Sequence, residues 1–199
     1  MTGNSPDALS VRAAGPNDCA HLLILSDMAT RRLVWWGFDG KTAPGQSALE
    51  TGRSAILGDR SSLLHYSNWQ VIEWHRTIIG GLNGYPMPGA GAWAHSQSDV
   101  LRPLNELKAQ AAGSWYLSVA AVFPEHRNRG AGVQILNSAE AWPLQQGYRQ
   151  LSLMVGSFNC GAKRLYQRHG FREQDRRPFQ PFAGSDQSGE WILMMKDLD

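Results

Sequence analysis

The sequence predicts a mixed α/β domain, and three observations lead to that fold class. The chain has 199 residues, enough for one sizeable domain with its own core. Apolar residues make up 42% of it and charged residues only 18%, below the roughly 25% of an average globular chain. The second half runs strand, helix, strand, helix, strand, strand. We therefore expect one folded domain over residues 1–199.

Composition and charge argue against a nucleic-acid-binding, membrane, secreted or metal-binding protein. The net charge of +2 gives no reason to expect nucleic-acid or membrane binding. The polar start MTGNSPDALS does not resemble a signal peptide, and no run of about 18 apolar residues predicts a membrane span. The two cysteines, Cys19 and Cys160, are far apart, and the histidines form no paired ligand motif. We expect a cytoplasmic protein without a metal site.

In the first half, hydrophobic spacing and turn residues predict two helices and three strands. Asn17 or Asp18 can cap the first helix, because both side chains accept hydrogen bonds from free helix amides. His75-Arg76 separates two apolar runs as a hairpin turn does. The expected strands are Ala8–Ala13, Trp69–Trp74 and Thr77–Tyr85, and the expected helices run from Asp18 to about Trp35 and over Ala48–Leu57.

In the second half, the apolar run Trp115–Phe123 predicts a strand that is buried on both faces. Pro143 lies inside the next helical pattern, where it should kink or shorten the helix near Ala139–Pro143. The expected helices are 100–111, 130–146 and 159–169, and the remaining strands lie around 151–155, from 171 onward, and at 191–195.

The stretch VFPEHRNRGAGVQIL, residues 122–136, places two arginines and two glycines at a strand-to-helix turn. Free amides at a helix start bind anions, and glycine lets a ligand approach the backbone. Arg127 and Arg129 add forked donors that match phosphate oxygens. Neither a P-loop motif nor G-x-G-x-x-G is present, so the turn predicts a different pyrophosphate site. The alternative is an ordinary helix start with exposed arginines.

Two motifs together resemble the GNAT (GCN5-related) N-acetyltransferase superfamily. The first is Val122-Phe123-Pro124 followed by Arg127–Gly132, which is similar to the family's V-x-P and [R/Q]-x-x-G-x-[G/A] pattern. The second is NCGAKRLYQRHGF, residues 159–171, which meets every fixed position of N-x-x-A-x-x-L-Y-x-x-x-G-F. The resemblance implies one GNAT-like domain with an acetyl-CoA-binding core at about 115–172. It also implies a twisted, mostly antiparallel sheet with a splayed strand pair and helices on both faces.

The resemblance also implies which residues hold acetyl-CoA as co-substrate. The turn would bind the pyrophosphate through backbone amides, and the end of the preceding strand would pair with the pantetheine arm and stabilise the oxyanion. Asn159 would hold the pantetheine or cap its helix, and both roles are compatible. The implied cofactor-binding residues are Ala120, Ala121, Val122, Arg127, Asn128, Arg129, Gly130, Ala131, Gly132, Asn159 and Tyr166.

For catalysis, the resemblance assigns Tyr166 as the general acid that protonates the departing thiolate. Many family members place a glutamate on the first-motif strand as general base, but the segment 116–122 carries no carboxylate. Glu73 is the candidate base, and the alternative is that it is an ordinary exposed strand residue. Glu125 and His126 beside the turn, or a water chain that ends at backbone carbonyls, are the other options.

The resulting hypothesis is an acetyl-CoA-dependent N-acetyltransferase in which the amine attacks directly within a ternary complex. A non-catalytic acyl-CoA-binding or sensing module on the same fold is the alternative. Cys160 at a helix start could suggest an acyl-enzyme, but the family pattern does not use that position. The partner would be a small-molecule or peptide amine, without nucleic acid or membrane. The sequence leaves a homodimer open.

Overall fold

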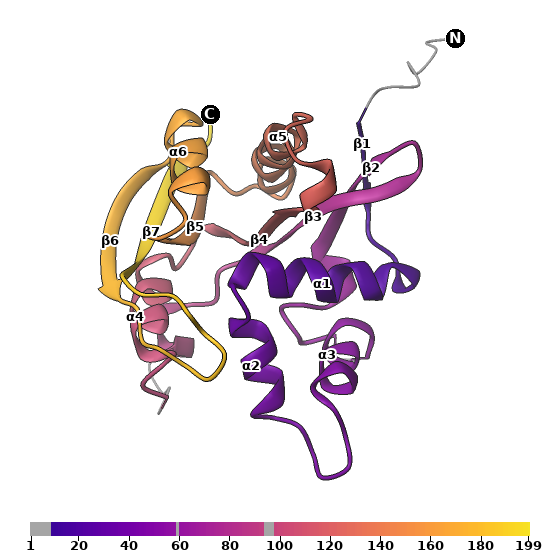
Figure 1. Ribbon diagram of the computed structural model, residues 1–199. Coiled ribbons are helices and arrows are strands. Elements are labelled where there is room, and N and C mark those ends of the chain that lie inside the picture. Colours follow the sequence, from indigo (N-terminus) through magenta and orange to yellow (C-terminus); the bar gives the residue numbers. More distant parts are fainter. Residues whose placement is uncertain (1–8, 59, 94–97) are drawn as a thin grey trace. The chain divides into compact units, whose positions relative to one another are not determined.

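The computed structural model describes residues 9–58, 60–93 and 98–199 and confirms the mixed α/β class (Figure 1). Ala8, expected to begin the first strand, lies outside the described residues. None of the helices in these ranges is both long and apolar enough to cross a membrane. The helices are α1 Cys19–Thr30, α2 Leu33–Asp39, α3 Ala48–Leu57, α4 Arg102–Gln110, α5 Ala131–Gln145 and α6 Cys160–Arg168. The strands are β1 Ser10–Ala13, β2 Trp69–Trp74, β3 Thr77–Pro86, β4 Trp115–Val122, β5 Gln150–Gly156, β6 Arg172–Pro178 and β7 Glu190–Asp197.

The strands form an open seven-stranded sheet in the order β1-β2-β3-β4-β5-β7-β6. Pairs β1–β2, β2–β3, β5–β7 and β6–β7 are antiparallel, whereas β4 and β5 are parallel. The chain divides into two compact units. The first unit comprises Met1–Gly84 and Val119–Ser138, and the second comprises Tyr85–Ser118 and Ala139–Asp199.

The core of the first unit joins its helices to β2. Leu22 and Leu25 of α1 and Ile56 of α3 are fully buried. They belong to one apolar cluster with Trp69 and Val71 of β2. Burying such side chains contributes about 1.5–3 kcal/mol each, so this cluster is a main source of stability for the unit.

The prediction of one helix to about Trp35 was wrong, because the helix breaks after Thr30. Arg31 and Arg32 both adopt left-handed backbone conformations, with φ of 51° and 71°. The amide of Arg32 donates to the carbonyl of Asp27 at 3.1 Å, which closes α1. The hydroxyl of Thr30 accepts from the amide of Val34 at 3.2 Å and supports the first turn of α2. A glycine would have indicated the end of the helix, but arginine has no such preference for a left-handed backbone. The helical spacing of apolar residues continues across the break, so it predicted a single helix.

The β2–β3 hairpin has the predicted turn. His75 and Arg76 have φ of 49° and 65°, as a two-residue turn between twisted strands requires at both central positions. The register shifts within the hairpin: Ile72 pairs with Gly80, whereas Glu73 pairs with Ile78. Ile79 is therefore the extra residue of a β-bulge, which bends β3 beside Gly80.

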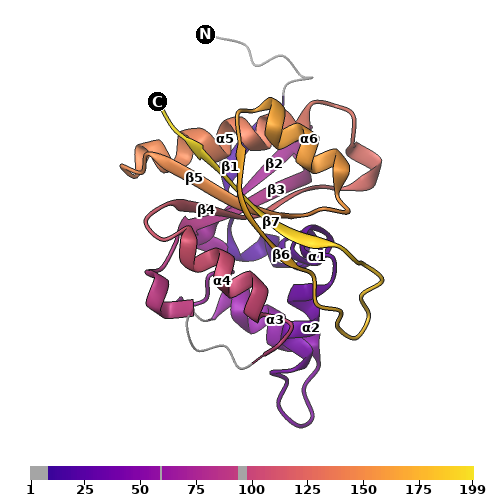
Figure 2. The ribbon, with the colours of Figure 1, turned by 90° about the vertical axis from the view of Figure 1, so that its left-hand side faces the viewer.

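In the second unit, α6 lies on one face of β5, β7 and β6, and α4 lies on the other (Figure 2). The parallel pairing of β4 with β5 covers Trp115–Leu117 against Leu151–Leu153. The expected shortening of the helix near Ala139–Pro143 was wrong, and the expected kink stays a prediction. The proline lies within α5, but the helix continues to Gln145, so the missing amide does not end it at that point.

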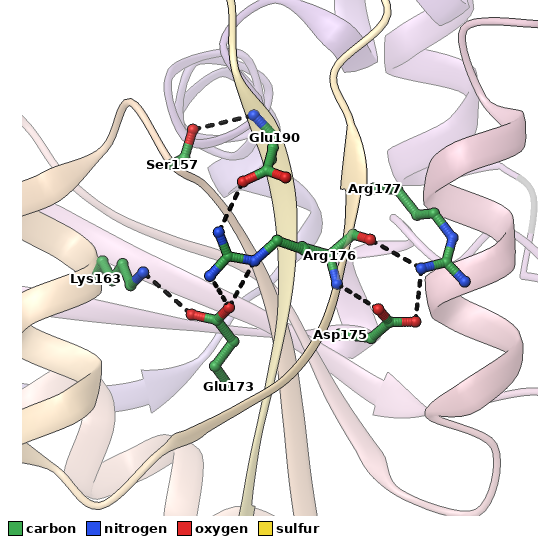
Figure 3. A network of polar contacts seen from close by, with 7 residues as sticks. All are labelled: Ser157, Lys163, Glu173, Asp175, Arg176, Arg177 and Glu190. Carbon is green, nitrogen blue, oxygen red and sulfur yellow. Dashed lines mark hydrogen bonds and ion pairs between the residues drawn. The ribbon is translucent and has the colours of Figure 1, made fainter.

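β6 forms one edge of the sheet and carries a bulge between Glu173 and Asp175. Residues two apart on a regular strand share a face, but the bulge directs these two carboxylates to different helices. Glu173 lies 3.1 Å from the ammonium of Lys163 on α6, whereas Asp175 accepts from Gln110 on α4 at 2.7 Å. Arg176 joins Glu173 to Glu190 on β7, completing the network in Figure 3. These charges discourage pairing of the edge with another strand.

Candidate active site

The turn after β4 places a left-handed backbone at two positions. Asn128 has φ of 61° and Gly130 has φ of 79°, and both residue types tolerate that region. The helix α5 then begins at Ala131. The amides of Val133 and Gln134 donate to the carbonyl of Gly130 at 3.0 and 3.1 Å. The amides before these precede the helical ladder, so helix geometry leaves them for an external acceptor.

The two arginines of the turn are exposed and held by neighbours in the first unit. The Nε of Arg127 donates to the carbonyl of Val122 at 3.4 Å. The guanidinium of Arg129 lies over the ring of Trp74, 4.5 Å from its centroid. Both positive charges therefore stay beside the start of α5, whose dipole has the same sign. A Cβ added at Gly130 would meet no atom within 4 Å, so the backbone there faces open space. This arrangement can bind an anion.

The end of β4 approaches β3 closely at Gly80. A Cβ at Gly80 would lie 2.6 Å from the carbonyl oxygen of Ala121 and 3.2 Å from the Cα of Val122. The amide of Phe123 donates to the carbonyl of Ile79 at 2.9 Å. Gly80 thus fixes the path of the predicted pantetheine-binding residues, which are half-buried. Sequence reasoning missed this role, although two consecutive glycines inside a strand pattern indicate close backbone approach.

In the second unit, Asn159 is the N-cap of α6. Its Oδ1 accepts from the amide of Ala162 at 3.4 Å, which confirms the capping role. Its proposed contact with pantetheine stays a prediction.

Tyr166 lies on α6, seven residues after Asn159, with its ring 5.7 Å from that of Phe171. Burial raises the pKa of Tyr166 to about 12. The hydroxyl group therefore stays protonated at any physiological pH, as a proton donor must.

Two further tyrosines of the same unit, Tyr85 and Tyr116, are buried and form a cluster with Tyr166. The rings of Tyr85 and Tyr116 lie 5.6 Å apart. Burial raises the pKa of Tyr85 to about 12, although a hydrogen bond with Ser118 opposes the shift. Burial, together with the nearby Tyr85 and Tyr166, raises the pKa of Tyr116 well above its ordinary value. An anion in this cluster would be costly, so all three hydroxyl groups are neutral. The sequence reasoning did not identify this cluster, and nothing in the residue pattern distinguished it from core.

Glu73, the candidate base, lies in the first unit and forms an ion pair with an arginine. Its Oε1 lies 2.9 Å from the Nε of Arg12, and its side chain is 18% exposed. Arg12 also binds Asp18 at 2.7 Å, so one guanidinium links β1, β2 and the start of α1. The other acids and bases considered lie beside the turn: Glu125 is exposed, and the Nδ1 of His126 is buried without a hydrogen-bond partner. The base assignment remains a prediction.

The part of the chain that the structure describes contains two free cysteines and no cluster of metal-ligating side chains. Cys160 is an exposed free thiol 3.6 Å from the carbonyl of Ser157, and Cys19 is a buried free thiol. Over the described ranges, no three histidine, cysteine, aspartate or glutamate side chains gather as metal ligands would. Within each unit, then, the predicted residues fall into one group: the turn with the end of β4 in the first, and Asn159 with Tyr166 in the second.

Comparison with known proteins gives one family. A model of the acetyltransferase (GNAT) family matches residues 35–171. A comparison with curated proteins finds no match.

Solved structures share the fold at low sequence identity. A crystal structure of an acetyltransferase superimposes with a TM-score of 0.64 at 19% identity and covers 96% of this chain and 100% of its own. An N-acetyltransferase from Staphylococcus aureus Mu50 gives 0.62 at 17% identity, covering 94% and 100%. A variant of agmatine N-acetyltransferase in the apo form gives 0.66 at 14% identity, covering 96% and 100%.

The close approach at Gly80 leads to a stability prediction. Gly80→Ala should lower the free energy of unfolding by about 1–3 kcal/mol, because the methyl group would force Ala121 away. Gly89→Ala is the matched control, since a Cβ at Gly89 would meet no atom within 4 Å. Chemical denaturation of both variants measures the difference. Equal stabilities would show that β3 and β4 do not depend on this contact.

Proposed function

The chain belongs to the acetyltransferase (GNAT) family, and we propose that it transfers the acetyl group of acetyl-CoA directly to an amine within a ternary complex. The observation that carries the proposal is the turn between β4 and α5. Its left-handed residues Asn128 and Gly130 open the helix start, and two exposed arginines stand beside it. A diphosphate ester matches this combination of backbone amides and guanidinium groups.

The cofactor-binding roles follow from the chemistry of each segment. The amides of Gly130, Ala131 and Gly132, with Arg127, would hold the pyrophosphate. The backbone at the end of β4, Ala120–Val122, would pair with the amide groups of pantetheine, and one of its amides would donate to the thioester oxygen. On α6, Asn159 would keep its capping bond while its amide nitrogen reaches the pantetheine.

In the reaction, the lone pair of a neutral amine attacks the thioester carbon and the carbon–sulfur bond breaks. The product amide loses one proton from its nitrogen, and the sulfur gains one. A pKa of about 12 makes Tyr166 a weaker acid than a thiol near 8.5. Full transfer to a free thiolate would therefore be uphill by about 5 kcal/mol. We propose that Tyr166 donates as charge builds on sulfur, while positive charge on the attacking nitrogen lowers the cost of this step.

The base is Glu73 or a water chain that ends at backbone carbonyls. Glu73 must share its carboxylate between Arg12 and the amine, because the ion pair is already formed. Glu73→Gln with undiminished kcat and reduced stability would make the residue structural and leave the proton to water.

Binding through the turn is tested with paired substitutions at Gly130. Gly130→Val should abolish CoA binding, because a branched side chain would occupy the space where phosphates meet the backbone. Its φ of 79° also makes valine strained by roughly 1–2 kcal/mol. Gly130→Asn separates the two effects, since asparagine accepts the left-handed region but still adds a side chain. Calorimetry on both folded variants measures affinity, and wild-type affinity in both would end the proposal for this turn.

The role of Tyr166 gives the sharpest kinetic test. Tyr166→Phe keeps the ring but removes the proton, so kcat and kcat/KM should fall together by roughly 10²–10⁴-fold. CoA affinity should change little, and the loss should shrink with an acyl donor whose thiol is more acidic. Because the pKa is about 12, kcat of the wild type should show no decline caused by Tyr166 below about pH 11. Loss of CoA binding with kcat preserved would instead make the hydroxyl a binding group.

A further inference from the structure

The three helices of the first unit, α1, α2 and α3, enclose a pocket that the proposed function does not use (Figure 1). Its volume is about 550 Å³, within the range of small-molecule sites. Among the described residues, those that line it come only from these helices and from the link between α1 and α2. β4 and the turn after it contribute none of them, so the pocket is separate from the proposed CoA site.

Helical spacing places the pocket on the face of α1 that is turned away from the core. Leu22 and Leu25 are fully buried in the apolar cluster with β2. Ile24 and Asp27, which line the pocket, each follow one of them by two residues, about 200° around the helix. Ile24 is 51% exposed, and Leu49 of α3, which also lines the pocket, is 54% exposed. An apolar ligand would therefore gain free energy by covering these two side chains.

The break between α1 and α2 brings a guanidinium to the carboxylate of the pocket. The left-handed Arg32 donates its amide to the carbonyl of Asp27 at 3.1 Å, and both side chains line the pocket. Burial raises the pKa of Asp27 above its ordinary value, and the charge of Arg32 opposes this shift only in part. The Oδ1 of Asp27 is buried and has no hydrogen-bond partner among the described residues. A buried carboxylate oxygen without a donor is costly, so an N–H group of a ligand would be favoured there.

A second guanidinium lines the same pocket. Arg53 of α3 lies near the thiol of Cys19 on α1. A guanidinium has five N–H donors, so Arg32 and Arg53 can each donate to a ligand while they keep their neighbours in the protein. A ligand with only an ammonium group would meet two positive charges, and a ligand with only a carboxylate would meet Asp27. A molecule that carries both groups on an apolar body matches all of these side chains.

We propose that this pocket binds a free apolar α-amino acid. Its ammonium group would donate to the Oδ1 of Asp27, and its carboxylate would accept from Arg32 or Arg53. Its side chain would cover Ile24 and Leu49. The inference goes beyond the proposed acetyl transfer, because this ligand binds apart from the thioester and is not the acetyl acceptor.

The experiment is calorimetry on the full chain without CoA, so its outcome does not depend on acetyl transfer. L-Leucine and L-phenylalanine are the probes. 2-Phenylethylamine lacks the carboxylate of phenylalanine, and 3-phenylpropanoate lacks the ammonium group. L-Phenylalanine should bind at least about tenfold more tightly than either, because each has lost charge-assisted hydrogen bonds. Binding of neither amino acid, or equal affinity for phenylalanine and one of its analogues, would overturn the inference.

Variants then locate the binding. Asp27→Asn keeps the shape of the side chain and should weaken L-phenylalanine at least about tenfold. Leu49→Gln should weaken it roughly threefold to tenfold, because part of the apolar contact is lost. Leu49 is already exposed, so this variant should stay folded. Asp39→Asn is the matched control, since Asp39 is an exposed aspartate at the end of α2 that does not line the pocket. Unchanged affinity in both Asp27→Asn and Leu49→Gln would place the amino acid elsewhere and refute the proposal.

A second copy of the chain is the other occupant that an apolar pocket could take. Sedimentation of the wild type and of Leu49→Gln, with and without L-phenylalanine, separates the two occupants. The proposal predicts that Leu49→Gln does not change the sedimentation coefficient. A dimer that Leu49→Gln dissociates and that L-phenylalanine leaves intact would make the pocket a subunit interface, and the inference would be wrong.

Discussion

The left-handed backbone at Asn128 and Gly130 is the constraint on which the proposed phosphate site depends. It turns the chain from β4 into α5, and a Cβ added at Gly130 would meet no atom within 4 Å. The same turn places Arg127 against the carbonyl of Val122 and Arg129 over Trp74. A right-handed or extended residue at either position would direct the amides elsewhere. The local cost of an unusual conformation would thus be tied to the proposed binding of phosphates.

The close contact at Gly80 is a second constraint, and it acts on the strand before the turn. Because only a hydrogen atom fits between Gly80 and Ala121, β4 can run where a larger residue would displace it. The bulge at Ile79 directs a carbonyl to the amide of Phe123 and holds the last step before the turn. The proposed catalytic role of Tyr166, in the second unit, has a different basis. Burial keeps Tyr166 protonated but also weakens it as an acid, so the proposed proton transfer would depend on charge that appears during the reaction.

Much of this could be predicted from local sequence signals. The hairpin turn at His75-Arg76, the helix over Ala48–Leu57 and the capping by Asn159 follow from residue types with strong local preferences. The break at Arg31-Arg32 could not be predicted, because arginine carries no bias toward a left-handed backbone.

Contacts between segments that are distant in the sequence could not be predicted either. The stacking of Arg129 on Trp74 and the pairing of Glu73 with Arg12 join residues 55 and 61 positions apart, which no single-sequence pattern reports. The family motifs therefore indicated which segments to consider, but they could not indicate the distant residues that contact Arg129 and Glu73.

We propose above all that backbone amides at the start of α5 bind the phosphates of CoA. The most direct measurement is a titration of ¹⁵N-labelled protein with CoA, with inorganic pyrophosphate as the minimal ligand, followed through assigned amide resonances. We expect the amides of Gly130, Ala131 and Gly132 to be among those with the largest shifts for both ligands. Saturable CoA binding that leaves these three amides unmoved would contradict it.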